Sequence, residues 1–181
     1  LHAYDASKAM AEMIASSFFH TYGMNGVIAR NTNLYGGNDL NFSRLVSSML
    51  RGALVEKRIK LWGDGLVKRD FVYVEDAVRG MLLLGEKTDH ASVKGHAFTF
   101  ATGQPITIRR VCELVQKWFP HSLNVEWTPD KAIQDRDQAA LDVSHTRKVL
   151  EWESQTSLDA GLAETVKWYT HYFSNHGREN K

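Results

Sequence analysis

The sequence predicts an α/β fold, in which helices alternate with buried parallel strands. Residues 5–22 place their apolar side chains at the spacing of one helix face, and Gly23 is a residue type that ends helices. The short apolar run over 26–30, bounded by glycine and a polar loop, is typical of a buried parallel strand. A second helical pattern over 76–86 precedes a strand pattern over 96–101. This alternation indicates a layered α/β architecture.

The other elements follow in chain order. Apolar residues at helical spacing predict helices over 42–52, 107–119 and 144–151, and a last helix capped by Thr156 or Ser157. Apolar or alternating runs predict strands over 59–62, 67–74 and 123–127. The segments 31–39 and 128–139 are polar, and we expect both to be irregular.

Composition favours one globular domain, or the larger part of one. The chain has 181 residues, 43% of them hydrophobic and 24% charged, with a net charge of +1. No long block of like charge favours nucleic acid or a membrane surface, and no apolar run is long enough to span a bilayer. The 8 histidines show no metal-ligand spacing, so we expect no metal site. The single cysteine, Cys112, excludes an intramolecular disulfide and fits a cytoplasmic location.

The segment that begins at Tyr4 and ends at Lys8 is the first candidate for chemistry. The two side chains are four residues apart, so on a helix they lie on one face, one turn from each other. A lysine ammonium close to a phenol favours the phenolate, which can exchange a proton with a substrate hydroxyl. The alternative is an ordinary pair of surface side chains, because this spacing also occurs by chance.

Two polar segments at strand ends are further candidates. The loop over 31–39 follows a predicted strand, where α/β proteins bind ligands, but asparagine and glycine also form plain turns. Arg69 interrupts a strand pattern with charge. Its guanidinium can hold a phosphate by two parallel N–H bonds, or it can pair with the neighbouring Asp70.

Taken in order, these motifs resemble a known family. The resemblance rests on Tyr4-x-x-x-Lys8, Arg30-x-x-Asn33-x-Tyr35-Gly36, Gly63-Asp64-Gly65-x-x-x-Arg69-Asp70-Phe71-Val72-Tyr73-Val74-x-Asp76, Asp142-x-Ser144, and Gly161-Leu162-x-x-Thr165-Val166-x-Trp168-Tyr169. This succession resembles the C-terminal half of the extended short-chain dehydrogenase/reductases, the NAD-dependent sugar-nucleotide epimerases and dehydratases. The likeness extends from Tyr4 to about Tyr172.

The resemblance implies roles for the first motif. Tyr4 would be the catalytic acid/base, and Lys8 would bind the nicotinamide ribose of NAD while tuning Tyr4. Both would therefore contact the cofactor, which is NAD by resemblance, with NADP as the alternative. Asp76 matches a family aspartate at a helix start, where a carboxylate is favourable, and we interpret it as structural.

The resemblance also implies a set of substrate-binding residues. Asn33 falls where the family contacts the diphosphate of a nucleotide sugar, and Arg69 matches the arginine that holds the phosphates. Arg136 is similar to a second arginine of that kind. The segment 38–44, with Arg44 at its end, lies where the family often builds its base and ribose pocket.

A division of the chain follows from the same resemblance. Residues 1–30 and 77–119 would be the remnant of a Rossmann-like, doubly wound parallel sheet that binds NAD. Residues 31–76 and 120–181 would form most of the smaller α/β domain that binds the nucleotide sugar. The family's Gly-rich dinucleotide fingerprint is not in the sequence, so we expect a fragment that lacks the N-terminal half.

The implied function is NAD-dependent modification of a nucleotide-diphosphate sugar through a 4-keto intermediate, by 4,6-dehydration or 4-epimerisation. The segment 36–44 is similar to that of certain 4,6-dehydratases. The alternative is a truncated, non-catalytic fragment that binds nucleotide sugars or only oligomerises.

Uncovered apolar side chains predict an oligomer. Without the other strands of the sheet, several apolar side chains would lose their cover, namely Met10, Ile14, Phe18, Val27 and Ile28. An exposed apolar patch of that kind usually meets a partner. We therefore expect a homo-oligomer, or pairing with the missing half.

Overall fold

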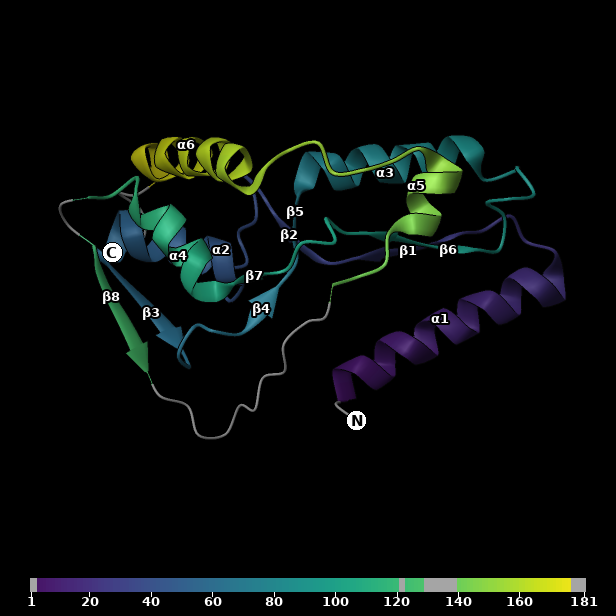
Figure 1. Ribbon diagram of the computed structural model, residues 1–181, viewed down its shortest axis with the longest axis horizontal. Coiled ribbons are helices and arrows are strands. Elements are labelled where there is room, and N and C mark those ends of the chain that lie inside the picture. The colour runs from purple at the N-terminus through teal and green to yellow at the C-terminus, as the bar shows by residue number, and fades with distance from the viewer. Residues whose placement is uncertain (1–2, 121–122, 129–139, 177–181) are drawn as a thin grey trace.

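The computed structural model describes residues 3–120, 123–128 and 140–176 (Figure 1). Its helices are α1 (Ala3–Tyr22), α2 (Leu45–Arg51), α3 (Val74–Lys87), α4 (Ile108–Gln116), α5 (Ser144–Leu150) and α6 (Leu158–His176), and a π-helical turn, η1 (Gly52–Glu56), continues α2. Its strands are β1 (Ile28–Asn31), β2 (Asn33–Tyr35), β3 (Arg58–Trp62), β4 (Lys68–Arg69), β5 (Phe71–Tyr73), β6 (Ala97–Phe100), β7 (Ile106–Thr107) and β8 (Asn124–Thr128).

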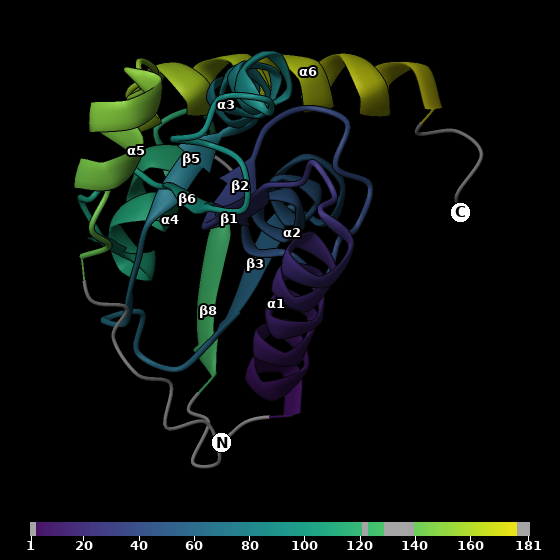
Figure 2. The same cartoon turned by 90° about the vertical axis from the view of Figure 1, so that its right-hand side faces the viewer.

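The strands β1 and β6 form the layer nearest to α1. They are parallel, with Ile28 opposite Ala97 and Asn31 opposite Phe100. Helix α3 lies on one side of this pair and α1 on the other, as Figures 1 and 2 show from two directions. The small core packs here, and it consists of the buried residues Leu84, Val93, Phe98, Phe100, Leu150 and Trp152.

The rest of the described chain surrounds a second and larger core. The pairs β2–β5 and β3–β8 are parallel, and β4–β7 is antiparallel. The large core comprises the buried apolar faces of β2, α2, β3, β5, α4 and α6, and Met49, Val115 and Leu162 are at most 1% exposed within it. Helix α4 packs in the large core and α5 in the small one, so segments of the two cores alternate along the chain. The two-part division proposed from the sequence stays a prediction.

Two helix starts follow the sequence closely. The Thr107 hydroxyl accepts a hydrogen bond from the backbone N–H of Arg110 at 3.2 Å, so the predicted cap of α4 is confirmed. The Ser157 hydroxyl accepts one from the backbone N–H of Ala160 at 3.2 Å, so of the two predicted caps it is Ser157 that caps α6.

Two predictions around the polar loops were wrong. The segment 31–39 is not irregular throughout, because Asn33–Tyr35 forms β2 beside β5. The predicted strand over 67–74 is instead β4, a break at Asp70, β5 and the first residue of α3. The break has a clear cause, since the buried Asp70 carboxylate accepts hydrogen bonds from the loop after β6.

Helix α2 begins later than its apolar spacing predicted. The side-chain oxygen of Asn41 accepts the backbone N–H of Ser43 at 3.1 Å, which holds a turn directly before the helix. Arg44 is then extended, and the helix begins at Leu45 rather than at residue 42. Helix α4 ends at Gln116, short of the predicted residue 119.

Asp76 has the structural role that its position at a helix start indicated. It is 4% exposed, and its carboxylate accepts the backbone N–H groups of Gln155 and Thr156 at 3.0 and 2.8 Å. Arg79 and Ser154 donate to it as well. Burial alone raises the pKa of Asp76, but these hydrogen bonds outweigh burial and hold the pKa below its ordinary value. The carboxylate thus ties α3 to the segment that leads into α6.

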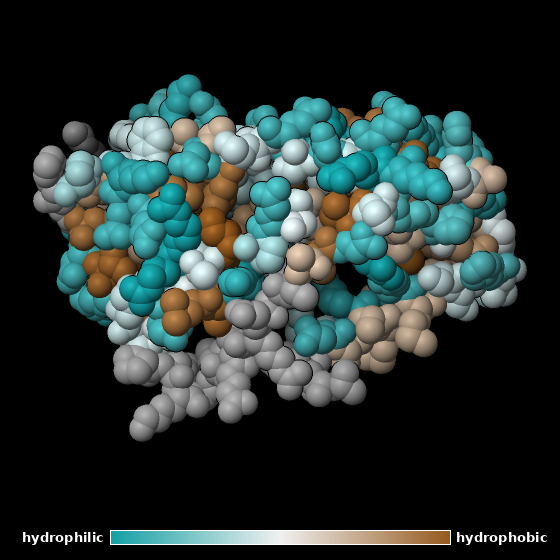
Figure 3. All heavy atoms as spheres, viewed as in Figure 1, coloured by the Kyte–Doolittle hydropathy of each residue, from teal (hydrophilic) through white to brown (hydrophobic). Residues whose placement is uncertain are grey.

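Helix α1 has no buried residue. Met10, Ile14 and Phe18 are 56%, 59% and 49% exposed, as the sequence predicted, whereas Val27 and Ile28 are half-buried. In Figure 3 pale-brown side chains gather at the lower right, over α1. Among the described helices, none combines the length and the apolar character needed to cross a bilayer.

Candidate functional site

A cleft of about 860 Å³ opens between α1, the β1–β2 connection, α2 and β3. Four of the six predicted site residues line it, namely Tyr4, Asn33, Arg44 and Arg69. They come from α1, β2, the residue before α2, and β4. The fold therefore brings together side chains that are up to 65 positions apart in the chain.

Of the predicted pair Tyr4 and Lys8, Tyr4 lines this cleft. The Lys8 ammonium lies 5.6 Å from the centroid of the Tyr4 ring, which is the helical neighbourhood that their spacing predicted. Tyr4 is 63% exposed, and Lys8 is exposed beside it without lining the cleft. Within the same turn of the helix, the Ser7 hydroxyl donates to the Tyr4 carbonyl at 2.7 Å.

An ion pair connects α1 to the sheet one turn beyond Lys8. The Arg30 guanidinium on β1 donates to the Glu12 carboxylate on α1 through two nitrogens. This hydrogen bonding lowers the pKa of Glu12, because it favours the charged carboxylate more than burial opposes it. The pair ties the helix that carries Tyr4 to the strand that leads to Asn33.

The cleft lining also includes the polar groups predicted for substrate. The side-chain amide of Asn33 donates to the Asp70 carbonyl at 2.8 Å, which sets the orientation of that amide. Arg69 is half-buried, and its guanidinium donates to the Lys68 carbonyl at 2.9 Å. Arg44 lies 3.3 Å from the carboxylate of Asp39.

Sequence reasoning missed two residues of this lining. Lys60 and Trp62 on β3 line the cleft, and Trp62 is 70% exposed. The alternation of β3 was visible in the sequence, and in the structure Ile59 and Leu61 are buried while the intervening side chains are exposed. What the exposed face lines depends on packing.

The lining therefore favours an anion that carries a flat ring. The lining contains three basic side chains, Arg44, Lys60 and Arg69, and one acidic side chain, Asp39. Clustered cations of this kind raise the local concentration of an anionic ligand. Phe42 and Trp62 add aromatic surface, which suits a nucleobase or another planar group.

The sixth predicted site residue and the question of a metal ion remain. Arg136 lies outside the described residues. Within the part of the chain that the structure describes, no group of three or more histidine, cysteine or carboxylate side chains is arranged to hold a metal ion.

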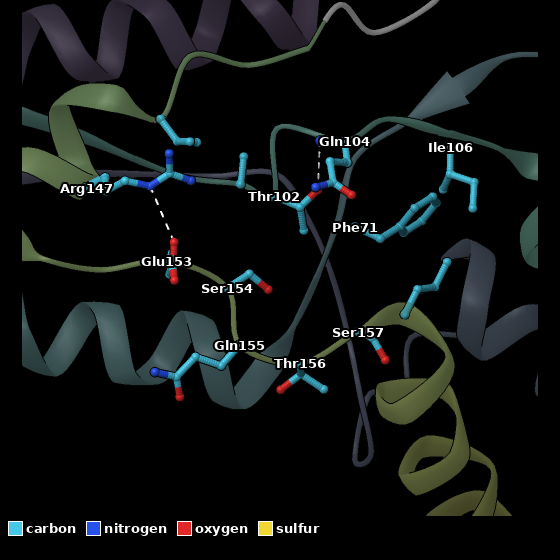
Figure 4. A pocket seen from close by; sticks show the side chains of 13 residues that line it. Phe71, Thr102, Gln104, Ile106, Arg147, Glu153, Ser154, Gln155, Thr156 and Ser157 are labelled. Atoms are coloured by element: carbon cyan, nitrogen blue, oxygen red, sulfur yellow. Dashed lines mark hydrogen bonds and ion pairs between the residues drawn. The ribbon is translucent and has the colours of Figure 1, made fainter.

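A second pocket, of about 470 Å³, shares Phe71 with the cleft among its lining residues (Figure 4). None of the predicted site residues lines it. Its charged groups bind each other, since Arg147 lies 3.4 Å from the carboxylate of Glu153. The backbone N–H of Gln104 donates a hydrogen bond to the Thr102 hydroxyl at 3.0 Å. The predicted site residues that line a cavity therefore line the larger cleft and not this pocket.

Comparison with known proteins gives the family. A family model described as the NAD dependent epimerase/dehydratase family matches residues 1–98. The dTDP-glucose 4,6-dehydratase of Haemophilus influenzae is 28% identical over 176 residues, which cover 92% of this chain and 51% of that protein. The UDP-glucuronate 4-epimerase of Thermodesulfobacterium geofontis is 30% identical over 175 residues, covering 93% and 50% of the two chains.

A solved structure extends the likeness to three dimensions. The crystal structure of dTDP-glucose 4,6-dehydratase from Bacillus anthracis in complex with NAD has a TM-score of 0.82 to this chain at 27% identity. The alignment covers 96% of this chain and 54% of that one. The α/β class with a Rossmann-like parallel sheet is thereby confirmed. The chain spans about half the length of the curated relatives it matches.

The family assignment rests on extent as well as likeness. The matched region runs from the reactive pair on α1 through β1, the cleft wall and β5 to the start of β6. It includes more than half of the 181 residues. The chain belongs to the NAD dependent epimerase/dehydratase family.

Proposed function

We propose that this chain supplies the acid/base and the substrate-binding wall of an enzyme that modifies a nucleotide-diphosphate sugar through a 4-keto intermediate. The observation that carries the proposal is the cleft that Tyr4, Asn33, Arg44 and Arg69 line together. A proton-transfer group and an anion-binding wall in one cavity are what such a substrate needs.

Tyr4 and Lys8 are the groups that act on the sugar. Tyr4, with the Lys8 ammonium beside its ring, takes the proton of the C4 hydroxyl as the C4–H bond breaks. NAD, when bound, accepts the hydride that leaves C4, and C4 becomes a carbonyl. These residues suit that cofactor, because the lysine can contact its ribose while the exposed tyrosine beside it contacts a substrate hydroxyl.

The reaction position comes from the relatives. A 4,6-dehydratase and a 4-epimerase, as their names state, both act at C4 of a nucleotide sugar. Oxidation at C4 is the step that both outcomes share, since a 4-ketone permits either loss of water or return of the hydride to the other face. We therefore assign the 4-keto stage to this protein and leave the base and sugar to the assay.

The remaining cleft residues hold the nucleotide. Arg69 binds the diphosphate, with Asn33 as a neutral partner, and Arg136 is proposed as a further phosphate ligand. Arg44, at the end of the segment 38–44, is proposed to contact the base and ribose. Lys60 adds charge beside them, and Trp62 offers a face on which a base can stack.

The first experiment is Tyr4→Phe in the complete protein. We expect turnover of the preferred sugar to fall by about 10²–10⁴-fold, the usual contribution of a general acid/base, with the unfolding temperature unchanged. The substrate panel contains dTDP-glucose, UDP-glucose and UDP-glucuronate. Tyr22→Phe is the matched control, since Tyr22 is 68% exposed on the same helix and does not line the cleft. Turnover of Tyr4→Phe close to that of the parent rejects the assignment.

A binding function without redox chemistry is the second candidate. It is favoured by the position of the cationic wall, which stands on the large core and not on α1. Calorimetry that detects nucleotide-sugar binding, while assays with NAD detect no turnover, would select this candidate.

We also propose that the protein is a homo-oligomer that covers the exposed face of α1. Met10, Ile14 and Phe18 lie at i, i+4 and i+8, so they form one apolar stripe on this helix. Contiguous exposed apolar residues of this kind mark interaction surfaces.

A further inference from the structure

We propose that Asp70 is a positioning residue for substrate binding: its buried carboxylate fixes the chain between Arg69 and Phe71 so that both line the cleft beside Asn33. The inference rests on the proposed function, since it names how the anion-binding wall of that site is held. Asp70 itself does not line the cleft.

The carboxylate of Asp70 is completely buried, and the loop after β6 donates three hydrogen bonds to it. Asp70 is 0% exposed. One carboxylate oxygen accepts the backbone N–H of Thr102 at 3.0 Å and the Thr102 hydroxyl at 2.8 Å. The other accepts the backbone N–H of Gly103 at 2.8 Å. These three donors come from the loop that follows β6, on the side of the second pocket in Figure 4.

The backbone carbonyl of Asp70 is bound on the other side, to the cleft wall. It accepts the side-chain amide of Asn33 at 2.8 Å and the hydroxyl of Thr32 at 3.0 Å. The backbone N–H of Asn33 is also directed at it, at 3.3 Å. One residue thus joins the loop after β6 to the segment between β1 and β2.

The side chains next to Asp70 show what its anchoring holds in place. Arg69 lines the cleft, Phe71 lines both the cleft and the second pocket, and the Asp70 carboxylate between them is bound by the loop after β6. Successive side chains in extended chain lie on opposite faces, so anchoring the central one fixes how its two neighbours are presented. A displacement of this segment moves Arg69, Phe71 and the partner of the Asn33 amide together.

The charge and shape of the group are specific. An asparagine in place of Asp70 keeps one carbonyl oxygen, but its NH₂ then meets the backbone N–H of Gly103 or the donors of Thr102. Donor faces donor in either orientation, and a buried donor is left without an acceptor. The chain relieves this by moving, and small displacements of ligand-binding groups are sufficient to weaken binding.

Asp76 provides a matched control. It is almost as buried, at 4% exposed, and it too accepts backbone N–H groups and a hydroxyl. It does not line the cleft and holds no residue that does. Loss of either carboxylate should destabilise the fold, whereas only loss of Asp70 should alter the presentation of the anion-binding wall.

The test compares Asp70→Asn and Asp76→Asn in the complete protein carrying NAD. The measured quantities are the Kd of UDP and dTDP by calorimetry, and KM and kcat for the preferred sugar. We expect Asp70→Asn to raise Kd and KM by about ten- to hundredfold with kcat little changed, as for a loss of uniform binding. Asp76→Asn should lower the unfolding temperature and leave Kd and KM at the parent values.

A milder variant keeps the test decisive if Asp70→Asn does not fold. Thr102→Val removes one donor to the Asp70 carboxylate from a residue outside the cleft, and it should raise Kd by about two- to tenfold. A Kd of Asp70→Asn or Thr102→Val equal to that of Asp76→Asn overturns the inference and leaves the proposed function intact. A parent protein that binds neither nucleotide overturns the proposed function, and the positioning role with it.

Discussion

Helices α1 and α6 are nearly equal in length, with 20 and 19 residues, yet the fold holds them in opposite ways. Helix α6 buries Gly161, Leu162, Thr165, Val166 and Tyr169 in the large core. Helix α1 buries none of its residues, and it carries Tyr4 and Lys8. The helix with the proposed chemistry is therefore the one that contributes least to the core of the described chain.

Because α6 is packed in the core and α1 is not, substitutions on the two helices should affect different measurements. Substitutions on α6 should be visible in stability and only indirectly in function, because its side chains touch the core. Substitutions on α1 should be visible in turnover and association, because its side chains touch little else in the chain. The predictions below test this separation, beginning with the largest effect.

The largest difference is expected between Leu162→Ala and Met13→Ala. Leu162 is 1% exposed in the large core, so its truncation should lower the free energy of unfolding by about 2–5 kcal/mol. Met13 is 72% exposed on α1, and its truncation should change that free energy by at most about 0.5 kcal/mol. Urea unfolding of both variants measures the contrast. Equal losses would mean that α1 is buried in solution and that the contrast between the helices is wrong.

A smaller contrast is expected between the two carboxylates that anchor these helices. Asp76 is buried and holds the chain directly before α6, whereas Glu12 reaches Arg30 at the surface of α1. Asp76→Asn should lower the free energy of unfolding at pH 7 by about 1–3 kcal/mol, because it leaves buried N–H groups without an acceptor. Glu12→Gln should lower it by about 1 kcal/mol at most, since exposed ion pairs contribute little.

The contribution of Asp76 to stability should also depend on pH. The folded-state pKa of Asp76 is lowered, so the unfolded chain binds the proton more tightly. Its stabilisation is fully present above the unfolded pKa near 3.9 and is lost as the pH falls through the lower folded value. The parent should lose stability in this acid range, and Asp76→Asn should lose less. Parallel curves for the two proteins between pH 5 and 2 would contradict this account.

Periodicity explains what the sequence predicted of the fold. Helix α1 and the strands β1 and β6 are continuous patterns, and local spacing alone identifies them. The two-residue strand β7 and the three-residue strand β2 are not, because their pairing depends on partners far along the chain, such as Asn33 opposite Phe71. The break at Asp70 was missed for the same reason, since its cause lies in the loop after β6.

The candidate site divides in a similar way. Tyr4, Asn33, Arg44 and Arg69 were chosen from motifs, and the fold gathers all four in one cleft without testing their roles. Lys60 was missed because its contribution depends on which face of β3 meets the cleft. A strand pattern tells which residues share a face, and only packing tells what that face meets.

The smallest effect on stability is expected from Ile14→Gln, and it is the variant that tests what covers α1. Glutamine is a good helix former and Ile14 is 59% exposed, so the free energy of unfolding of the separated chain should change by at most about 0.5 kcal/mol. The same change places a polar group in the middle of the stripe formed by Met10, Ile14 and Phe18, and it should weaken self-association of the complete protein at least about tenfold. Sedimentation velocity over a range of concentrations measures the association. Lys167→Gln is the matched control, because Lys167 is exposed on α6, where the core already lies on the other side. If Ile14→Gln and Lys167→Gln sediment alike, the stripe is not the contact surface. If only Ile14→Gln dissociates, the helix that the chain itself leaves uncovered is covered by a second copy, and the exposure of α1 is a property of the separated chain.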